Sequence, residues 1–217
     1  MESVGGYRLV RSLGSGARAE VWLGHGGSGG EVPAIAAVKV FRPGVPIDSV
    51  DAEIEALGRT SSRHLVHLDD LATTPNGLPC LILQRLSARN LGRLLAGNRA
   101  LEPGEAVTIL APLALAVAEL HRVGVAHGAL RPSAVLFDEA GAPVIAGFGS
   151  ARLIGGFPDP PQAHSLTPVQ LGAQPAVAED LARLAAICRH VLERVPNGAA
   201  VTAWLDAGGS VGHAESF

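Results

Sequence analysis

The sequence predicts an α+β fold with two unequal lobes. Strand-like segments with a single helix fill the first part of the chain, helical segments dominate from Asn90 onward, and no shift in composition marks a third domain. We place the lobe boundary after Leu86, which gives a small β-rich lobe over residues 1–86 and a helical lobe over residues 87–217. Since 47% of the 217 residues are hydrophobic, the chain can bury a substantial core.

Apolar runs bounded by Gly, Pro or Asn predict the strands of the first lobe. The run Ala34–Phe41 is nearly continuous, which is typical of a buried strand. After it, Asp48 can cap a helix that runs through Leu57. The other four predicted strands are Tyr7–Leu13, Glu20–Gly24, Leu65–Leu71 and Leu78–Leu83.

Helical periodicity predicts most of the second lobe. Leu91, Leu94 and Leu95 fall on one face of a short helix. A longer helix over about Gly104–His121 is apolar on most sides, so we expect it to be buried, and a last helix covers Val177–Leu192. The remaining predicted elements are two short strands, 135–137 and 144–145, and an irregular Gly- and Pro-rich segment, 155–175.

The composition excludes several classes of protein. A net charge of −3 gives no basic surface for nucleic acid. The two cysteines, Cys80 and Cys188, are too few for a disulfide framework and suit a reducing compartment. The first residues lack a signal-peptide pattern, and the longest apolar stretch, Ile109–Leu120, is shorter than the roughly 20 residues that cross a bilayer. We therefore expect a cytoplasmic chain without a membrane segment, and a tether beyond Phe217 stays open.

Lysine is almost absent from the chain. Of its 17 basic residues 16 are arginine, and the exception is Lys39 in the third predicted strand. A position that keeps lysine against such a bias can require a compact ammonium group rather than a planar guanidinium. Chance retention is the alternative, and the surroundings of Lys39 decide between the two.

Several motifs, taken in chain order, resemble the signature series of protein kinases. The segment Leu13–Val21 is similar to the glycine-rich loop that covers the phosphates of ATP, with Ala19 in place of the third glycine. The segment Ala37–Val40 is similar to the strand that carries the phosphate-contacting lysine. The resemblance implies a nucleotide-binding set of Gly14, Gly16, Val21, Ala37, Lys39, Glu53, Leu83, Leu86 and Leu136.

Glu53 resembles the helix glutamate that pairs with the phosphate-contacting lysine. It follows Lys39 by 14 residues, and Glu55 is the weaker alternative for the same role. Such a pair would hold the helix inward and aim the ammonium at the phosphates. A salt bridge that only fixes the helix is an equally open hypothesis.

The segment His127–Phe137 is similar to the catalytic loop of the family, His-Arg-Asp-Leu-Lys-Pro-Glu-Asn. Ala129 stands in place of the aspartate that accepts the substrate proton, Ala134 in place of the metal-binding asparagine, and Arg131 in place of the lysine. In the segment that resembles Asp-Phe-Gly, Gly147 replaces the aspartate that binds Mg²⁺. A methyl group or a hydrogen cannot bind a hard cation, so we expect no metal site.

By the same resemblance, the residues that link the two lobes in the family are present in this sequence. Asp180 matches the helix aspartate that anchors the catalytic loop, whereas Gly128 replaces the arginine of that loop. The activation segment ends in Leu166–Val169, without the glutamate of the family. The second lobe is shorter than that of the family, so either it is natively short or the chain is part of a longer protein. The expected column between the lobes consists of Leu57, Leu68, His127 and Phe148.

These losses lead us to expect a catalytically inactive domain, similar to bacterial Ser/Thr kinases but with a shortened second lobe. It would act in signalling as a binding, scaffolding or regulatory module for a protein partner or for further domains of a longer chain. It could bind ATP or ADP weakly without Mg²⁺. The alternative is an atypical Ser/Thr kinase or nucleotide-transferring enzyme with residual ATP-dependent activity, and a purely structural domain without a ligand is a third hypothesis.

Overall fold

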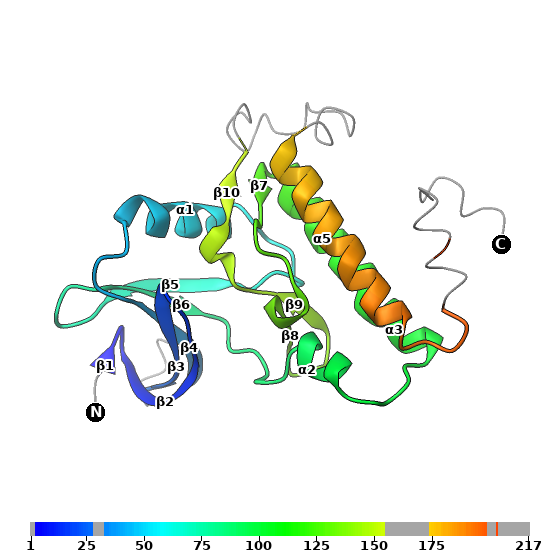
Figure 1. Cartoon of the computed structure of the whole chain (residues 1–217). Coiled ribbons are helices and arrows are strands. Elements are labelled where there is room, and N and C mark those ends of the chain that lie inside the picture. The colour runs from blue at the N-terminus through cyan, green and yellow to red at the C-terminus, as the bar shows by residue number, and fades with distance from the viewer. Residues whose placement is uncertain (1–2, 28–32, 155–173, 199–202, 204–217) are drawn as a thin grey trace.

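The computed structural model describes residues 3–27, 33–154, 174–198 and 203, and within them the predicted order of elements is present (Figure 1). The first lobe contains β1 (Ser3–Val4), β2 (Tyr7–Ser15), β3 (Ala19–Gly26), β4 (Ile35–Phe41), α1 (Ile47–Gly58), β5 (Leu68–Thr73) and β6 (Pro79–Leu83). The α+β prediction of a β-rich lobe followed by a helical lobe is confirmed. Most of the segment 155–175, the Leu166–Val169 motif and residues 199–202 and 204–217 lie outside the described residues.

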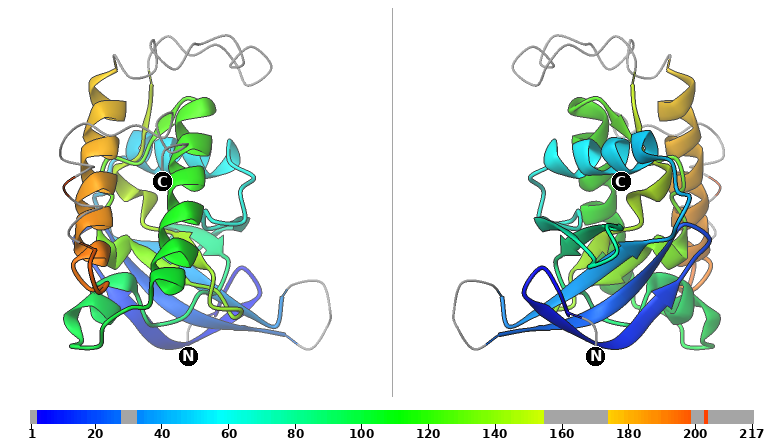
Figure 2. Two further views of the ribbon diagram at one scale, coloured as in Figure 1. Left: turned by 90° about the vertical axis from the view of Figure 1, so that its right-hand side faces the viewer. Right: turned by 90° about the vertical axis from the view of Figure 1, so that its left-hand side faces the viewer.

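The second lobe is built mainly on two long helices. These are α3 (Pro103–Arg122) and α5 (Pro175–Leu192), which run side by side (Figures 1 and 2). The smaller elements are α2 (Leu91–Ala96), β7 (Val125–Ala126), η1 (Pro132–Ala134), β8 (Val135–Phe137), β9 (Pro143–Ile145), η2 (Phe148–Ser150) and β10 (Arg152–Leu153). The two-residue strands escape sequence prediction because so short a segment has no measurable period.

The six strands of the first lobe form one sheet in the order β1-β2-β3-β4-β6-β5. Each neighbouring pair is antiparallel, and β4 lies inside the sheet with β3 and β6 beside it. Apolar clusters cover both faces of β4, since Val38 packs with Tyr7 on one side and Phe41 packs with α1 on the other. This double burial explains the continuous apolar run of β4.

The main core runs through both lobes. It joins Leu57 of α1 and Leu81 of β6 to Phe148 of η2 and to Leu113 and Ile187 of the long helices. Backbone hydrogen bonds strengthen this junction, because the N–H of Val66 donates to the Ile145 carbonyl at 2.9 Å. The floor of any site between the lobes is therefore continuous packed structure.

Three local predictions differ from the structure. Asp48 does not cap α1, because the N-cap is Pro46, two residues earlier, and Asp48 lies in the first turn. There its carboxylate still complements the helix dipole. Leu94 is 40% exposed, although Leu91 and Leu95 are buried as expected. Of the three leucines of this short helix, only Leu91 and Leu95 are therefore buried against the core.

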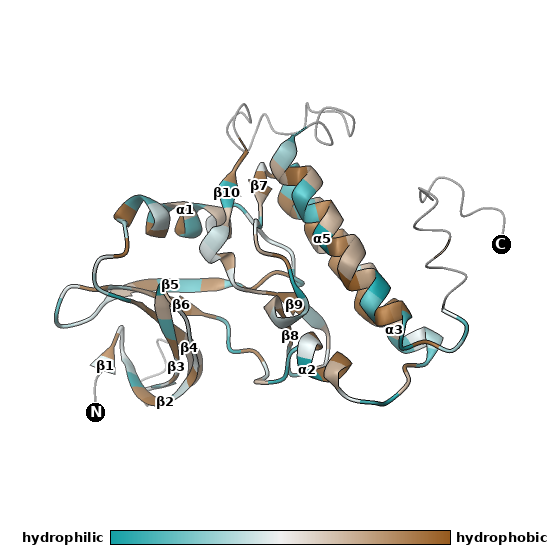
Figure 3. Cartoon of the chain, viewed as in Figure 1, coloured by the Kyte–Doolittle hydropathy of each residue, from teal (hydrophilic) through white to brown (hydrophobic). Residues whose placement is uncertain are grey.

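The helix α3 is less buried than its composition predicts. Glu102 and Glu105 form a capping box and Pro103 occupies its first turn, which fixes where it begins. Val107 and Leu115 remain 63% and 68% exposed, whereas the opposite side packs toward α5 and β9. Figure 3 shows hydrophilic and hydrophobic residues alternating along α5, which lies in front of α3 in this view. Within the described ranges, α3 is the one helix long and apolar enough to span a membrane, and core helices pass the same test.

Candidate nucleotide-binding site

A pocket of about 420 Å³ lies between the two lobes. The first lobe supplies one wall through β2, β3, β4, α1 and β6, and the second lobe supplies the other through α2, the loop before β8 and the segment before η2. Apolar side chains line one part and charged side chains another. The predicted nucleotide-binding residues that line the pocket are Gly14, Val21, Ala37, Lys39, Glu53, Leu83, Leu86 and Leu136.

Gly16 is the one predicted nucleotide-binding residue that is not in the lining. Its N–H donates to the Ala19 carbonyl at 2.9 Å and closes the tight turn between β2 and β3. The guanidinium of Arg42 donates to the Gly16 carbonyl at 2.9 Å and to Ser15 at 2.7 Å. Gly16 therefore shapes the turn above the pocket, and its contact with a nucleotide stays a prediction.

Lys39 and Glu53 form an ion pair inside the pocket. The Nζ of Lys39 on β4 donates to Oε1 of Glu53 on α1, and the two side chains are 12% and 3% exposed. The Phe41 ring lies 4.8 Å from the ammonium, measured to the ring centroid. Glu55 instead pairs with Arg59 at 2.5 Å on the surface, so the structure favours Glu53 over its alternative.

The surroundings of Lys39 set its charge state. Burial lowers the pKa of the ammonium, the Glu53 carboxylate opposes this shift, and the positive charge of Arg18 adds to it. Among the described residues, Oε2 of Glu53 has no hydrogen-bond partner. A buried carboxylate oxygen without a partner is costly, which makes this end of the pocket favourable for a further donor.

The two positions that bind metal in the family lie close together, and neither carries a side chain that can coordinate a metal ion. A β-carbon placed on Gly147 would lie 4.0 Å from the β-carbon of Ala134, and Gly147 adopts a left-handed conformation with φ of 83°. In the described part of the chain, no group of three or more His, Cys, Asp or Glu side chains could hold a metal ion. The nearby Asp138 and Glu139 are occupied in the β8–β9 turn and with Arg85. The residues present do not fit Mg²⁺.

Gly128, which stands in place of the family arginine, lies too close to Ser150 for a side chain. Its φ is 71°, and an added β-carbon would lie 2.3 Å from the Ser150 carbonyl oxygen. No side chain fits at that distance without a backbone shift. The loop and the end of η2 thus approach each other through their backbones.

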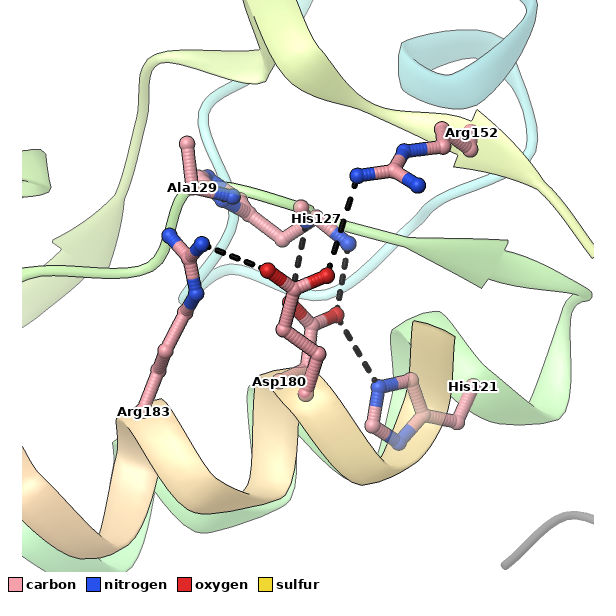
Figure 4. A network of polar contacts seen from close by, with 8 residues as sticks. His121, His127, Ala129, Arg152, Asp180 and Arg183 are labelled. Carbon is pink, nitrogen blue, oxygen red and sulfur yellow. Dashed lines mark hydrogen bonds and ion pairs between the residues drawn. The ribbon is translucent and has the colours of Figure 1, made fainter. Parts of the chain in front are cut away.

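Asp180 of α5 anchors the loop from below (Figure 4). Its carboxylate accepts backbone hydrogen bonds from His127 at 2.7 Å and from Gly128 at 2.9 Å, and it contacts Nε2 of His121 at 3.2 Å. Burial favours the neutral acid, but these hydrogen bonds outweigh it and lower the pKa of Asp180. The anchor is therefore ionised and fully enclosed.

His127 connects this anchor to the column between the lobes. Its ring meets Phe148 edge-on, with centroids 4.9 Å apart, and Nε2 lies 3.1 Å from the Ala146 carbonyl. The N–H of Ala129 donates to Nδ1 at 3.3 Å, so the neutral ring with a proton on Nε2 satisfies both contacts. Leu57 and Phe148 are buried in the main core and Leu68 packs against it.

Three basic residues of the site were missed from sequence. Arg18 lies at the turn between β2 and β3, Arg93 of α2 lines the pocket, and His121 of α3 reaches the Asp180 carboxylate. Arg18 lies within the glycine-rich motif, so its position was a usable signal. Arg93 and His121 sit on helices whose register against the loop is a tertiary property.

The chain matches the protein kinase domain family over residues 7–167. It is 30% identical over 166 residues to the serine/threonine-protein kinase PknK of Mycobacterium bovis, which covers 72% of this chain and 15% of that protein. It is 30% identical over 161 residues to the serine/threonine-protein kinase PkaB of Streptomyces coelicolor, and this match covers 68% of this chain and 37% of that protein. The chain thus spans well under half of these curated relatives.

These findings overturn the prediction of a catalytically inactive, non-enzymatic module. The family is an enzyme family and both relatives are named as kinases, so the atypical-kinase alternative agrees with them better. The error came from equating three lost side chains with lost chemistry, although phosphoryl transfer depends mainly on positioning and charge neutralisation. A protein kinase domain also implies ATP binding. The match covers most of the sequence, and the chain belongs to the protein kinase family.

Proposed function

We propose that this chain is an atypical Ser/Thr protein kinase domain that binds ATP between its lobes and transfers the γ-phosphoryl group to a protein hydroxyl. The observation that carries the proposal is the buried Lys39–Glu53 pair inside the 420 Å³ pocket. In a chain with a single lysine, this placement supports a phosphate-contacting role over chance retention.

The pocket supports binding of free ATP in which side-chain cations replace the metal. Among the lining residues, Lys39, Arg93 and Arg131 are basic and Glu53 is the acidic one. The apolar part, with Val21, Ala37 and Leu136, suits an adenine ring. A polyanion entering this pocket meets net positive charge even without a divalent ion.

The phosphoryl transfer can proceed without a side-chain base. The substrate hydroxyl oxygen forms a bond to the γ-phosphorus while the bond to the β–γ bridging oxygen breaks, and ADP leaves with that electron pair. Since Ala129 offers no acceptor, the hydroxyl proton passes to an oxygen of the transferred phosphoryl group and then to water. The loose transition state of phosphoryl transfer needs little help at this step.

We place the domain in the cytoplasm, with its protein substrate supplied by a partner or by further domains of a longer chain. The Ser/Thr preference rests on the names of PknK and PkaB. The substrates of those proteins are theirs, and the substrate of this chain is identified only by its hydroxyl chemistry.

Transfer to Ser/Thr peptides, followed by mass spectrometry, tests this function. The purified chain is incubated with ATP in EDTA and with Mg²⁺ or Mn²⁺, and the added mass distinguishes a phosphoryl from a nucleotidyl group. Lys39→Met and Glu53→Gln should abolish most transfer, whereas Glu55→Gln on the outer face of the same helix should retain it. Transfer no greater than that of Lys39→Met under every condition would overturn the proposal.

A further inference from the structure

Arg18 occupies a position beside the phosphate end of the pocket. It belongs to the turn between β2 and β3, and it is half-buried rather than free in solvent. Arg18 does not line the pocket itself; it lies next to Lys39 and Glu53, which do. A β-carbon built on Gly149 would lie 3.6 Å from Arg18 Nη1, 3.8 Å from Glu53 Oε2 and 3.9 Å from Lys39 Nζ. The polar ends of the three side chains therefore converge on one point.

The guanidinium of Arg18 is held in place by one of its nitrogens. Nη2 donates to the hydroxyl of Ser49 at 2.7 Å and to its backbone carbonyl at 3.2 Å, so the turn is tied to the start of α1. Nη1 is the nitrogen near Gly149. An arginine anchored in this way keeps one edge of its fork available for a second acceptor at little entropic cost.

The charges around this point are unbalanced. Two cations, Arg18 and Lys39, meet the single carboxylate of Glu53, whose Oε1 accepts from Lys39. The family's metal-binding positions carry Ala134 and Gly147, so no acidic side chain at these positions competes for the cations. An anion with several oxygens complements this arrangement better than a metal ion does.

We infer that Arg18 is a phosphate-binding residue, which supplies from the glycine-rich turn part of the positive charge that Ala134 and Gly147 cannot recruit through a metal. This inference rests on the proposed function, because the ligand it names is the triphosphate of ATP. Arg18 and Lys39 would bind the same phosphate oxygens that Mg²⁺ binds in solution. Free ATP is therefore the favoured ligand, and Mg²⁺ does not raise its affinity.

Titration calorimetry with ATP and with adenosine, in EDTA and in Mg²⁺, tests the inference. Arg18→Gln should weaken ATP binding by about tenfold, which corresponds to the loss of roughly 1.4 kcal/mol from a hydrogen bond to a charged group. Adenosine binding should not change, because adenosine has no phosphate. Arg18→Lys should recover part of the ATP affinity. Arg11→Gln, an exposed arginine on β2 outside the pocket, is the matched control and should behave as the wild type.

The outcomes separate the two proposals. If the wild type binds ATP but Arg18→Gln binds it equally well, the inference is wrong and the proposed function stands. The inference also fails if adenosine binding falls as much as ATP binding, since Arg18 would then only tie the turn to α1. It fails again if Mg²⁺ raises the ATP affinity of the wild type. If the wild type binds ATP under no condition, the proposed function itself is overturned.

Discussion

Ala134 and Gly147 lie next to each other in the second lobe, and a β-carbon on Gly147 would lie 4.0 Å from that of Ala134. The left-handed φ of 83° at Gly147 is one that aspartate tolerates better than most residues. The double change Ala134→Asn with Gly147→Asp should therefore create a Mg²⁺ site. ATP should then bind roughly an order of magnitude more tightly with Mg²⁺ than with EDTA, because a divalent ion adds charge at the phosphates.

Calorimetry in the two buffers checks this prediction. Gly141→Asp makes the same substitution at a similar φ of 85°, but in the β8–β9 turn outside the pocket lining, and should leave metal dependence unchanged. Equal ATP affinity of the double variant in Mg²⁺ and EDTA would show that more than these two ligands is missing.

Gly128→Ala should destabilise the fold more than Gly141→Ala. Both positions have positive φ, so each variant bears the left-handed cost of about 1–2 kcal/mol. At Gly128 the new methyl group also meets the Ser150 carbonyl oxygen at 2.3 Å, whereas at Gly141 nothing lies within 4 Å. Urea unfolding should show at least twice the loss of free energy at position 128. Equal losses would mean that the loop moves away from Ser150 at no cost.

Asp180→Ala should remove the anchor of the loop. Two buried N–H groups would lose their acceptor, at about 1–3 kcal/mol each, so unfolding should become easier by several kcal/mol. Glu179→Ala on the same helix is the control, because its partners Arg183 and Arg152 are exposed and the expected loss is under about 1 kcal/mol. Similar losses in the two variants, measured by urea unfolding, would contradict an anchoring role.

Acidification should destabilise the protein through His127. Burial lowers the pKa of His127 in the folded state below its usual 6.5, an effect that the Ala146 carbonyl and Asp180 only partly oppose. As the pH falls below about 6.5 the unfolded chain binds the proton first, so the free energy of unfolding decreases from there down to the folded pKa. Asp180 titrates below this window, since its pKa is lowered from 3.8.

Urea unfolding at pH 7.5 and 5.5 measures this effect. His127→Gln should be less stable than the wild type at pH 7.5, but its free energy of unfolding should fall less between pH 7.5 and 5.5. An unchanged loss would assign the pH dependence to groups other than His127.

Much of the fold could be predicted from sequence because its signals are local. The continuous run of β4 and the period of α3 are each contained in a short stretch. The exposed faces of α3 were not predictable, because burial depends on which elements pack against a helix. The same limit applies to β7 and β10, which are defined only by pairing with each other.

The features of the site also fall into those that the sequence predicts and those that only packing determines. The pairing of Lys39 with Glu53 could be predicted because the segments that carry the two residues resemble motifs of the protein kinase family. The closeness of Gly128 to Ser150, the contact of His121 with Asp180 and the reach of Arg18 to Ser49 join distant segments. Only packing determines these contacts. The loss of three side chains was visible in the sequence, but its consequence for enzyme activity was not.

The Asp180 anchor has a consequence for biosynthesis. Its carboxylate holds Gly128, 52 residues earlier in the chain, so the loop cannot reach its final shape until α5 has left the ribosome. At about 5–20 residues per second this delay is roughly 3–10 s, during which the six-stranded sheet of the first lobe is already complete in sequence. A nascent chain therefore possesses Lys39 and Glu53 well before it possesses an ordered floor beneath them.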